Sequence, residues 1–163
     1  MLTPVVAERP AQPYVAIREQ VTMQTMDDAL LPLQPQVFAW LHERDIPAAG
    51  PPFWKFNVID MMRLLEVEAA VPIATAAVGD DRVLAGVLAA GRYATVRYTG
   101  HPDGIINAVA DLREWAEKEG LTWDMTLAPD GEHWGARLEI HETDPAVEPD
   151  MTKWTTQLAF RLG

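Results

Sequence analysis

The side chains best suited to chemistry lie near the end of the chain, in the segment Leu138-Glu139-Ile140-His141. Apolar and polar residues alternate there, as on a β-strand with one buried face, so Glu139 and His141 share a side. If the apolar pair packs against helices, Glu139 faces away from them into a cleft. Desolvation in such a cleft raises the pKa of a carboxyl group, which suits cation binding or proton transfer.

Simpler interpretations of these residues stay open, because Glu139 can be an exposed strand carboxylate and His141 a solvated histidine. Glu66 and Glu68, in the similar segment LEVE, are expected at the surface. No metal site is predicted, since His133, Glu139, His141 and Glu142 fit no metal-ligand spacing. GRYATVRYTG lacks the pattern of a phosphate-binding loop, and no cofactor is predicted.

Aromatic side chains are the second set of candidates, because they can wall a cleft for an apolar or cationic ligand. Trp40 and Trp115 stand beside apolar residues at helical spacing and are expected in the core. The aromatic residues predicted to bind ligand together with Glu139 and His141 are Trp54, Phe56, Tyr98, Trp123, Trp134 and Trp154. For each of these, packing in the core or at its rim is an equally good interpretation.

Composition excludes several classes of function. The 163 residues include neither cysteine nor serine, which rules out disulfides, thiolate metal sites and serine or cysteine nucleophiles. A net charge of −11 is unsuited to a phosphate backbone, so no direct nucleic-acid partner is expected. No segment reads as a secretion signal or a membrane span, which predicts a cytoplasmic protein without a membrane partner.

Patterning predicts an α+β fold. The first dozen residues, which contain Pro4 and Pro10 and are followed by Pro13, are expected to be irregular. A helix is predicted over 27–44, kinked or split by Pro32 and Pro35, and another over 105–119. APDGEHWG is expected to be a turn. Strands are predicted over 14–23, 53–59, 64–73, 83–88, 93–98, 121–127, 136–141 and 154–162.

An internal repeat organises these elements into a single domain over 1–163, with halves at about 13–80 and 81–163. Tyr14-Val-Ala-Ile-Arg18 matches Tyr93-Ala-Thr-Val-Arg97, and LEVE at 65–68 matches LEIH at 138–141, where 121–127 and 136–141 form a hairpin. Two such strand-helix-strand-strand repeats should join into one antiparallel sheet with both helices on one face. A ligand cleft is expected between the repeats, and the face opposite the helices should either meet water or curve into that cleft.

In order along the chain, PYVAIREQVTM, LEVEAAVPI, GRYATVRYTGHPDG and ETDPAVEPDMTKW resemble a GyrI-like domain, as found in effector-binding domains of MerR- and AraC-type multidrug regulators. The resemblance implies a cleft lined by aromatic residues, with one buried acid that meets lipophilic cations. On the matching strand that acid is Glu139. Regulators of this type carry a helix-turn-helix, for which this chain offers no space, and Gln157 stands where a second acid is often found.

Three functions are consistent with these features. The favoured one is a stand-alone binding protein for lipophilic small molecules, cationic ones included. The first alternative, implied by the resemblance, is a hydrolase of cyclopropane-containing genotoxic natural products, with Glu139 handling a proton and Tyr98 holding the ring system. The second is a protein-interaction module like the gyrase inhibitor that names the family, with a basic protein as partner.

Overall fold

The computed structural model describes residues 2–60 and 62–163 and so leaves Met1, the first residue of the predicted lead-in, outside the described part. The helices are α1 (Met26–Leu30), α2 (Leu33–Glu43) and α3 (Ile105–Lys118), with short 3-10 turns η1 (Pro102–Gly104) and η2 (Met151–Lys153). The strands are β1 (Val5–Arg9), β2 (Gln12–Val21), β3 (Phe53–Ile59), β4 (Leu65–Pro72), β5 (Leu84–Leu88), β6 (Gly91–Thr99), β7 (Met125–Ala128), β8 (Gly131–Trp134), β9 (Arg137–His141) and β10 (Thr155–Arg161).

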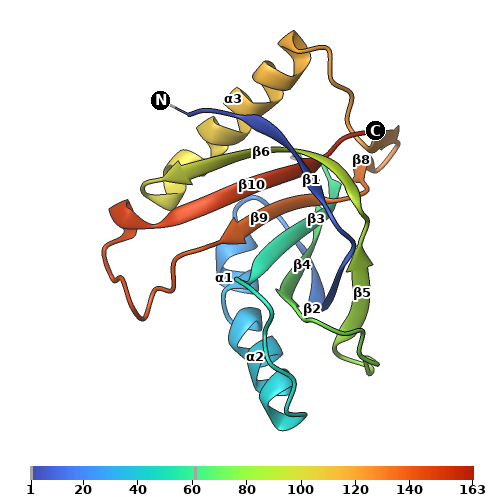
Figure 1. Cartoon of the computed structure of the whole chain (residues 1–163), viewed down its shortest axis with the longest axis vertical. Helices are drawn as coiled ribbons and strands as arrows, with labels where there is room; N and C mark the ends of the chain where they lie inside the picture. Colours follow the sequence, from blue (N-terminus) through green and yellow to red (C-terminus); the bar gives the residue numbers. More distant parts are fainter. Residues whose placement is uncertain (1, 61) are drawn as a thin grey trace.

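The strands form one curled antiparallel sheet in the order β1-β6-β10-β9-β3-β4-β2-β5 (Figure 1). The order is symmetric about the β9–β3 pair, because β10 and β6 follow β9 outward as β4 and β2 follow β3. The central ladder places Trp54 opposite Glu139, between the pairs Phe53–Ile140 and Lys55–Leu138. The two halves of the chain therefore meet along β3 and β9.

The two ends of the sheet also meet. β1 runs into β2 and β5 into β6, while β1 pairs with β6 and β2 with β5. Val5 opposite Thr95 and Ala16 opposite Leu84 belong to one antiparallel register that continues across the interruption between the strands. The strand pairings thus close into a ring that joins both halves a second time.

Both helical segments pack on the outer side of this curled sheet, as predicted. Leu30 of α1 and Leu112 of α3 are buried in one core with Val67, Val96 and other residues that point outward from the strands. In Figure 1, α1 and α2 lie near β2 to β4, whereas α3 lies near β6 and β10. The helix side of the sheet therefore carries the larger core, with β9 between the two helical segments.

The opposite side of the sheet packs against itself. Tyr14, Phe53, Tyr93, Leu138 and further residues form a second buried core inside the curl. For the residues of this second core, the expectation that the face would meet water is wrong, because closing the sheet brings its own side chains into contact there.

Several predicted elements need correction. The lead-in holds β1, whose pairing with β6 gives no sequence period because neither of its faces is fully buried. The predicted turn APDGEHWG contains β8, which pairs with β7 and with β3. The hairpin of 121–127 with 136–141 is therefore wrong, since β9 pairs with β3 and β10.

The repeat counterparts change accordingly. β9 occupies the place of β3, and β10 that of β4, so the match between Glu66 and Glu139 is wrong. The split of the first helix is confirmed: α1 ends before Leu31, and Pro32 precedes the first residue of α2.

Candidate ligand-binding site

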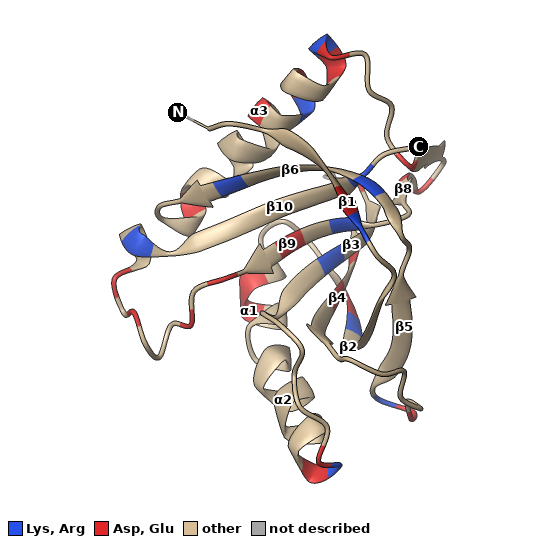
Figure 2. Ribbon diagram, viewed as in Figure 1, with Lys and Arg blue, Asp and Glu red and all other residues tan. Residues whose placement is uncertain are grey.

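Strand β9 carries a row of polar side chains on its helix side: Arg137, Glu139 and His141. Figure 2 shows a basic and an acidic position next to each other along this strand. The register settles the direction: Glu139 pairs with Trp54 and Leu158, and both of these belong to the helix-side core. Leu138 and Ile140 point into the curl. The expectation that this apolar pair packs on the helices is wrong, because the second core inside the curl takes it instead.

The Glu139 carboxylate is surrounded by protein but keeps a partial opening to solvent. Burial raises its pKa from 4.5 to about 7, while the charge of Arg137 acts to lower it and that of Asp27 on α1 to raise it. No residue within the described ranges donates a hydrogen bond to this carboxylate or forms an ion pair with it. Glu139 therefore exchanges a proton near neutral pH and has its acceptor oxygens available.

His141 lies beside Glu139 and contacts the same tryptophan. Its ring meets the Trp54 ring edge to face, with centroids 4.8 Å apart at 87°. Burial lowers the pKa of His141 from 6.5 to about 4, so the imidazole is neutral at physiological pH. The pair thus offers a carboxyl group and a neutral imidazole beside one indole.

The other predicted aromatic residues make contacts of their own. Tyr98 donates its hydroxyl to the carbonyl of His101 at 2.8 Å, and a Cβ on Gly104 would collide with it, so this hydroxyl ties the start of α3. Trp154 donates its indole N–H to the carbonyl of Glu148 at 2.7 Å. Trp123 packs in a cluster with Trp134 and Phe160, with ring centroids 5.5 and 5.8 Å from its own. The structure therefore brings Trp54 together with Glu139 and His141, while the other aromatic rings serve different contacts.

Arg137 was missed among the candidates, although alternation alone places it on the face of Glu139. Its guanidinium carbon lies 4.6 Å from the Phe160 ring centroid, 4.9 Å from that of Trp134 and 6.0 Å from that of Phe56. Burial lowers its pKa from 12.5 to about 10, which leaves it charged near neutral pH. Two predicted ligand-binding residues, Phe56 and Trp134, thus surround a cation of the protein itself.

A pocket of about 540 Å³ opens beside Arg137, between one face of α3 and the turn that joins β7 to β8. Its lining is mostly apolar and includes none of the eight predicted site residues. The residues that line it are Ile59, Asp60, Ile106, Val109, Ala110, Arg113, Leu127, Ala128, Pro129, Gly131, Glu132 and Arg137. Since Arg137 is two residues before Glu139 on the same face of β9, this pocket adjoins the row of polar side chains.

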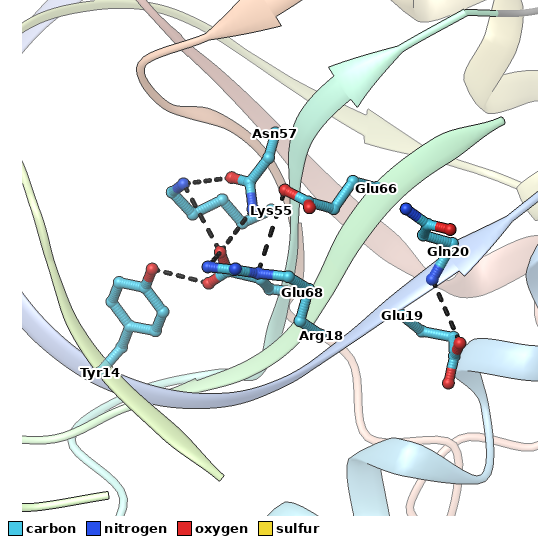
Figure 3. Close-up of polar contacts among 8 residues, drawn as sticks. All are labelled: Tyr14, Arg18, Glu19, Gln20, Lys55, Asn57, Glu66 and Glu68. Atoms are coloured by element: carbon cyan, nitrogen blue, oxygen red, sulfur yellow. Dashed lines mark hydrogen bonds and ion pairs between the residues drawn. The ribbon is translucent and has the colours of Figure 1, made fainter. Parts of the chain in front are cut away.

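A further polar cluster lies on the other side of the sheet, inside the curl (Figure 3). Glu68 is 1% exposed and accepts hydrogen bonds from Tyr14, at 2.7 Å, and from Asn57. Arg18 and Lys55 lie 3.5 and 3.9 Å from its carboxylate, and burial lowers the pKa of Lys55. The expectation that Glu68 is a surface residue is wrong, because four partners compensate its charge within the fold.

Across 2–60 and 62–163, no group of three or more histidine or acidic side chains could hold a metal ion. Over the same ranges, no helix has both the length and the apolar character needed to cross a bilayer.

The sequence matches the GyrI-like small molecule binding domain over residues 3–133, which is most of the chain. The chain belongs to the GyrI-like family. None of the curated protein sequences matches this GyrI-like protein significantly.

Solved structures share the GyrI-like fold at low sequence identity. EcmrR in its complex with DNA has a TM-score of 0.79 at 16% identity. The match covers 99% of this protein but only 57% of the EcmrR chain. The separate EcmrR C-terminal domain has a TM-score of 0.74 at 16% identity, with 100% and 98% of the two chains covered.

Two other proteins are more distant. SAV2435, solved bound to tetraphenylphosphonium, has a TM-score of 0.62 at 10% identity, covering 99% of this chain and 94% of that one. A hydrolase from Listeria innocua has a TM-score of 0.61 at 16% identity, covering 98% and 91%. At these identities the likeness establishes the fold alone.

Proposed function

We propose that this GyrI-like protein binds lipophilic small molecules, cationic ones included, on the helix side of the β3–β9 pair, with Glu139 as the counter-charge. Membership of a small-molecule-binding family supports the general activity. SAV2435, which shares the fold, was solved with a lipophilic cation, tetraphenylphosphonium. The place of binding is inferred from this chain's own residues.

The observation that carries the proposal is the state of Glu139. A buried carboxylate is normally compensated by hydrogen bonds or a cation. Glu139 has neither among the described residues, and burial accordingly raises its pKa to about 7. A ligand cation placed beside Glu139 and Trp54 would supply the missing charge and meet the indole ring. Ring contacts of this kind contribute roughly 0.5 to 2 kcal/mol each.

The test uses quenching of tryptophan fluorescence by tetraphenylphosphonium, with neutral triphenylphosphine oxide for comparison. We expect saturable binding of both, with the Glu139→Gln variant weakened about tenfold for the cation only. Glu117→Gln, an exposed change on α3 with the same effect on net charge, is the matched control and should bind as the wild type does. Absence of binding by either compound, or equal loss of both in Glu139→Gln, would refute the proposal.

Dependence on pH gives an independent reading of the same group. Only the ionised form of Glu139 attracts a cation, so affinity for tetraphenylphosphonium should rise as pH increases through about 7. Affinity for the neutral oxide should change little. In Glu139→Gln the pH dependence of cation binding should disappear.

A second candidate, hydrolysis of a strained ring, is favoured by one feature: a carboxyl group with a pKa of about 7 can accept and return a proton near neutral pH. In this reaction Glu139 takes a proton from a water whose oxygen bonds to a ring carbon. The breaking C–C bond leaves its electron pair on the other carbon, which is then protonated. The ring of Tyr98 can pack against the substrate, while its hydroxyl donates a hydrogen bond to the carbonyl of His101.

Mass spectrometry after incubation with an electrophilic cyclopropane tests this candidate. We expect a product heavier by one water, formed by the wild type and not by Glu139→Gln. If both proteins, or neither, form it, this candidate is excluded and the binding function is unaffected.

A further inference from the structure

Two arginines, Arg113 and Arg137, line the pocket, and both are paired with the same carboxylate, that of Glu132. Glu132 Oε2 lies 3.4 Å from Arg113 Nη2, and Glu132 Oε1 lies 3.8 Å from Arg137 Nη1. The indole N–H of Trp134 also donates to Glu132 Oε1, at 3.1 Å. A single carboxylate thus serves two guanidinium groups.

No other nearby acid of the described residues pairs with these two arginines. Asp60 accepts the backbone N–H of Met62 and lies 4.0 Å from Arg63, outside the pair of arginines. Within the described residues, Glu139 forms no ion pair with either arginine. Arg113 and Arg137 therefore have one ion-paired carboxylate between them, that of Glu132.

The guanidinium N–H groups of Arg137 donate no hydrogen bond within the described residues. The side chain of Arg137 is 12% exposed. Its nitrogen atoms are not fully buried, and Arg137 lines the pocket. The rings of Phe56, Trp134 and Phe160 hold the guanidinium in place, which leaves its N–H groups for an acceptor from outside.

We infer that this pocket binds a carboxylate on an apolar body, with Arg137 and Arg113 as its charged donors. A guanidinium presents paired N–H groups that match the two oxygens of a carboxylate. The apolar lining from α3 and the β7–β8 turn, including Ile106, Val109 and Leu127, contacts the body. The overall charge of −11 opposes an anion only weakly at this point, because salt screens it beyond about 8 to 10 Å.

This inference rests on the proposed function and specifies its ligand further. Glu139 and Arg137 lie two residues apart on one face of β9, so one bound molecule can meet both a carboxyl group and a guanidinium group. Compounds with an amine at one end and a carboxylate at the other fit both groups.

The experiment compares three probes with one aromatic body: pyrenebutyrate, its neutral amide and pyrenebutylamine. Binding is followed by energy transfer from tryptophan to pyrene and by calorimetry. We expect the wild type to bind the acid at least about tenfold more tightly than the amide. Arg113→Gln and Arg137→Met should each remove this preference and leave binding of the amide within about twofold.

Arg97→Gln is the matched control, because Arg97 is exposed, pairs with Glu142 and changes the net charge equally. It should retain the preference for the acid. Arg113 lies on the surface of α3, so its variant keeps the test valid if Arg137→Met fails to fold.

Equal binding of acid and amide by the wild type would overturn the inference, as would a preference that persists in both arginine variants. If amide and amine still bind, and Glu139→Gln weakens only the amine, then the proposed function stands and the carboxylate site alone is refuted. If none of the probes and no tetraphenylphosphonium binds, the proposed function itself fails.

Discussion

Replacing Glu139 by glutamine should stabilise the protein, and by an amount that depends on pH. Burial raises the pKa of Glu139 from 4.5 in the unfolded chain to about 7 in the fold. The folded state therefore holds a proton that the unfolded state releases between these two values. The free energy of unfolding contributed by this group is fully present below pH 4.5 and is lost as pH rises through about 7.

The size of the effect follows from the shift. Each pKa unit corresponds to about 1.36 kcal/mol, so the ionised Glu139 costs the wild type roughly 3 kcal/mol at about pH 8. Glutamine has nearly the same shape and no charge to desolvate. The difference between Glu139→Gln and wild type should hence grow by up to roughly 3 kcal/mol between about pH 5 and pH 8.

Urea denaturation at several pH values measures this difference, with Glu117→Gln as the control for net charge. The slope against pH is the decisive quantity, because any change in packing adds only a constant. A difference between Glu139→Gln and wild type that stays flat from about pH 5 to 8 would show that Glu139 is not desolvated in solution.

Three further predictions concern stability. Burial lowers the pKa of His141 from 6.5 to about 4, so the free energy of unfolding of the wild type should fall by up to roughly 3 kcal/mol as pH falls across that interval. Acid titrations followed by circular dichroism should show that His141→Gln lacks this loss. Glu68→Leu should cost about 3 kcal/mol in urea denaturation because it leaves buried donors and cations without their acid, whereas the same change at the more exposed Glu66 should cost under about 1 kcal/mol. Equal costs at the two positions would contradict the assignment. Gly104→Ala should lower stability by about 2 kcal/mol by displacing the Tyr98 ring, and adding Tyr98→Phe should recover part of it in thermal melts; no recovery would place the collision elsewhere.

Local pattern was enough to predict most of the elements. Strand-like composition located β3 to the residue, and apolar spacing with a glycine stop located α3. Pro32 predicted the break between α1 and α2. These features depend on neighbours along the chain, which the sequence displays directly.

Pairing of distant strands was not predictable in the same way. β1 is a strand because β6 accepts its backbone, and its own side chains carry no period. Which way Glu139 points depended on whether helices or a second core take Leu138, and only closure of the sheet decides that. Glu68 was misplaced for the same reason, since Tyr14, Asn57 and Lys55 reach it from other strands.

The candidate site was predictable in its residue types more than in its connections. Alternation placed Glu139 and His141 side by side, and it also marks Arg137, which was overlooked because an arginine on a strand usually reads as surface. Nothing in the sequence indicates that Phe56, Trp134 and Phe160 gather around that arginine.

The central pair of the sheet has a consequence for how a duplicated chain differs from a dimer of identical halves. Since β9 takes the place of β3, the pair formed by Trp54 and Glu139 is the point where each half meets its own equivalent position. In a symmetric dimer one residue type would face itself there: two carboxylates would repel each other in a poorly hydrated place, and two indoles would crowd. Covalent fusion of the halves frees the two positions to differ, so that a single acid stands opposite a single aromatic ring. A molecule bound there, as we propose, would meet one charged centre and bind in one orientation instead of two equivalent ones.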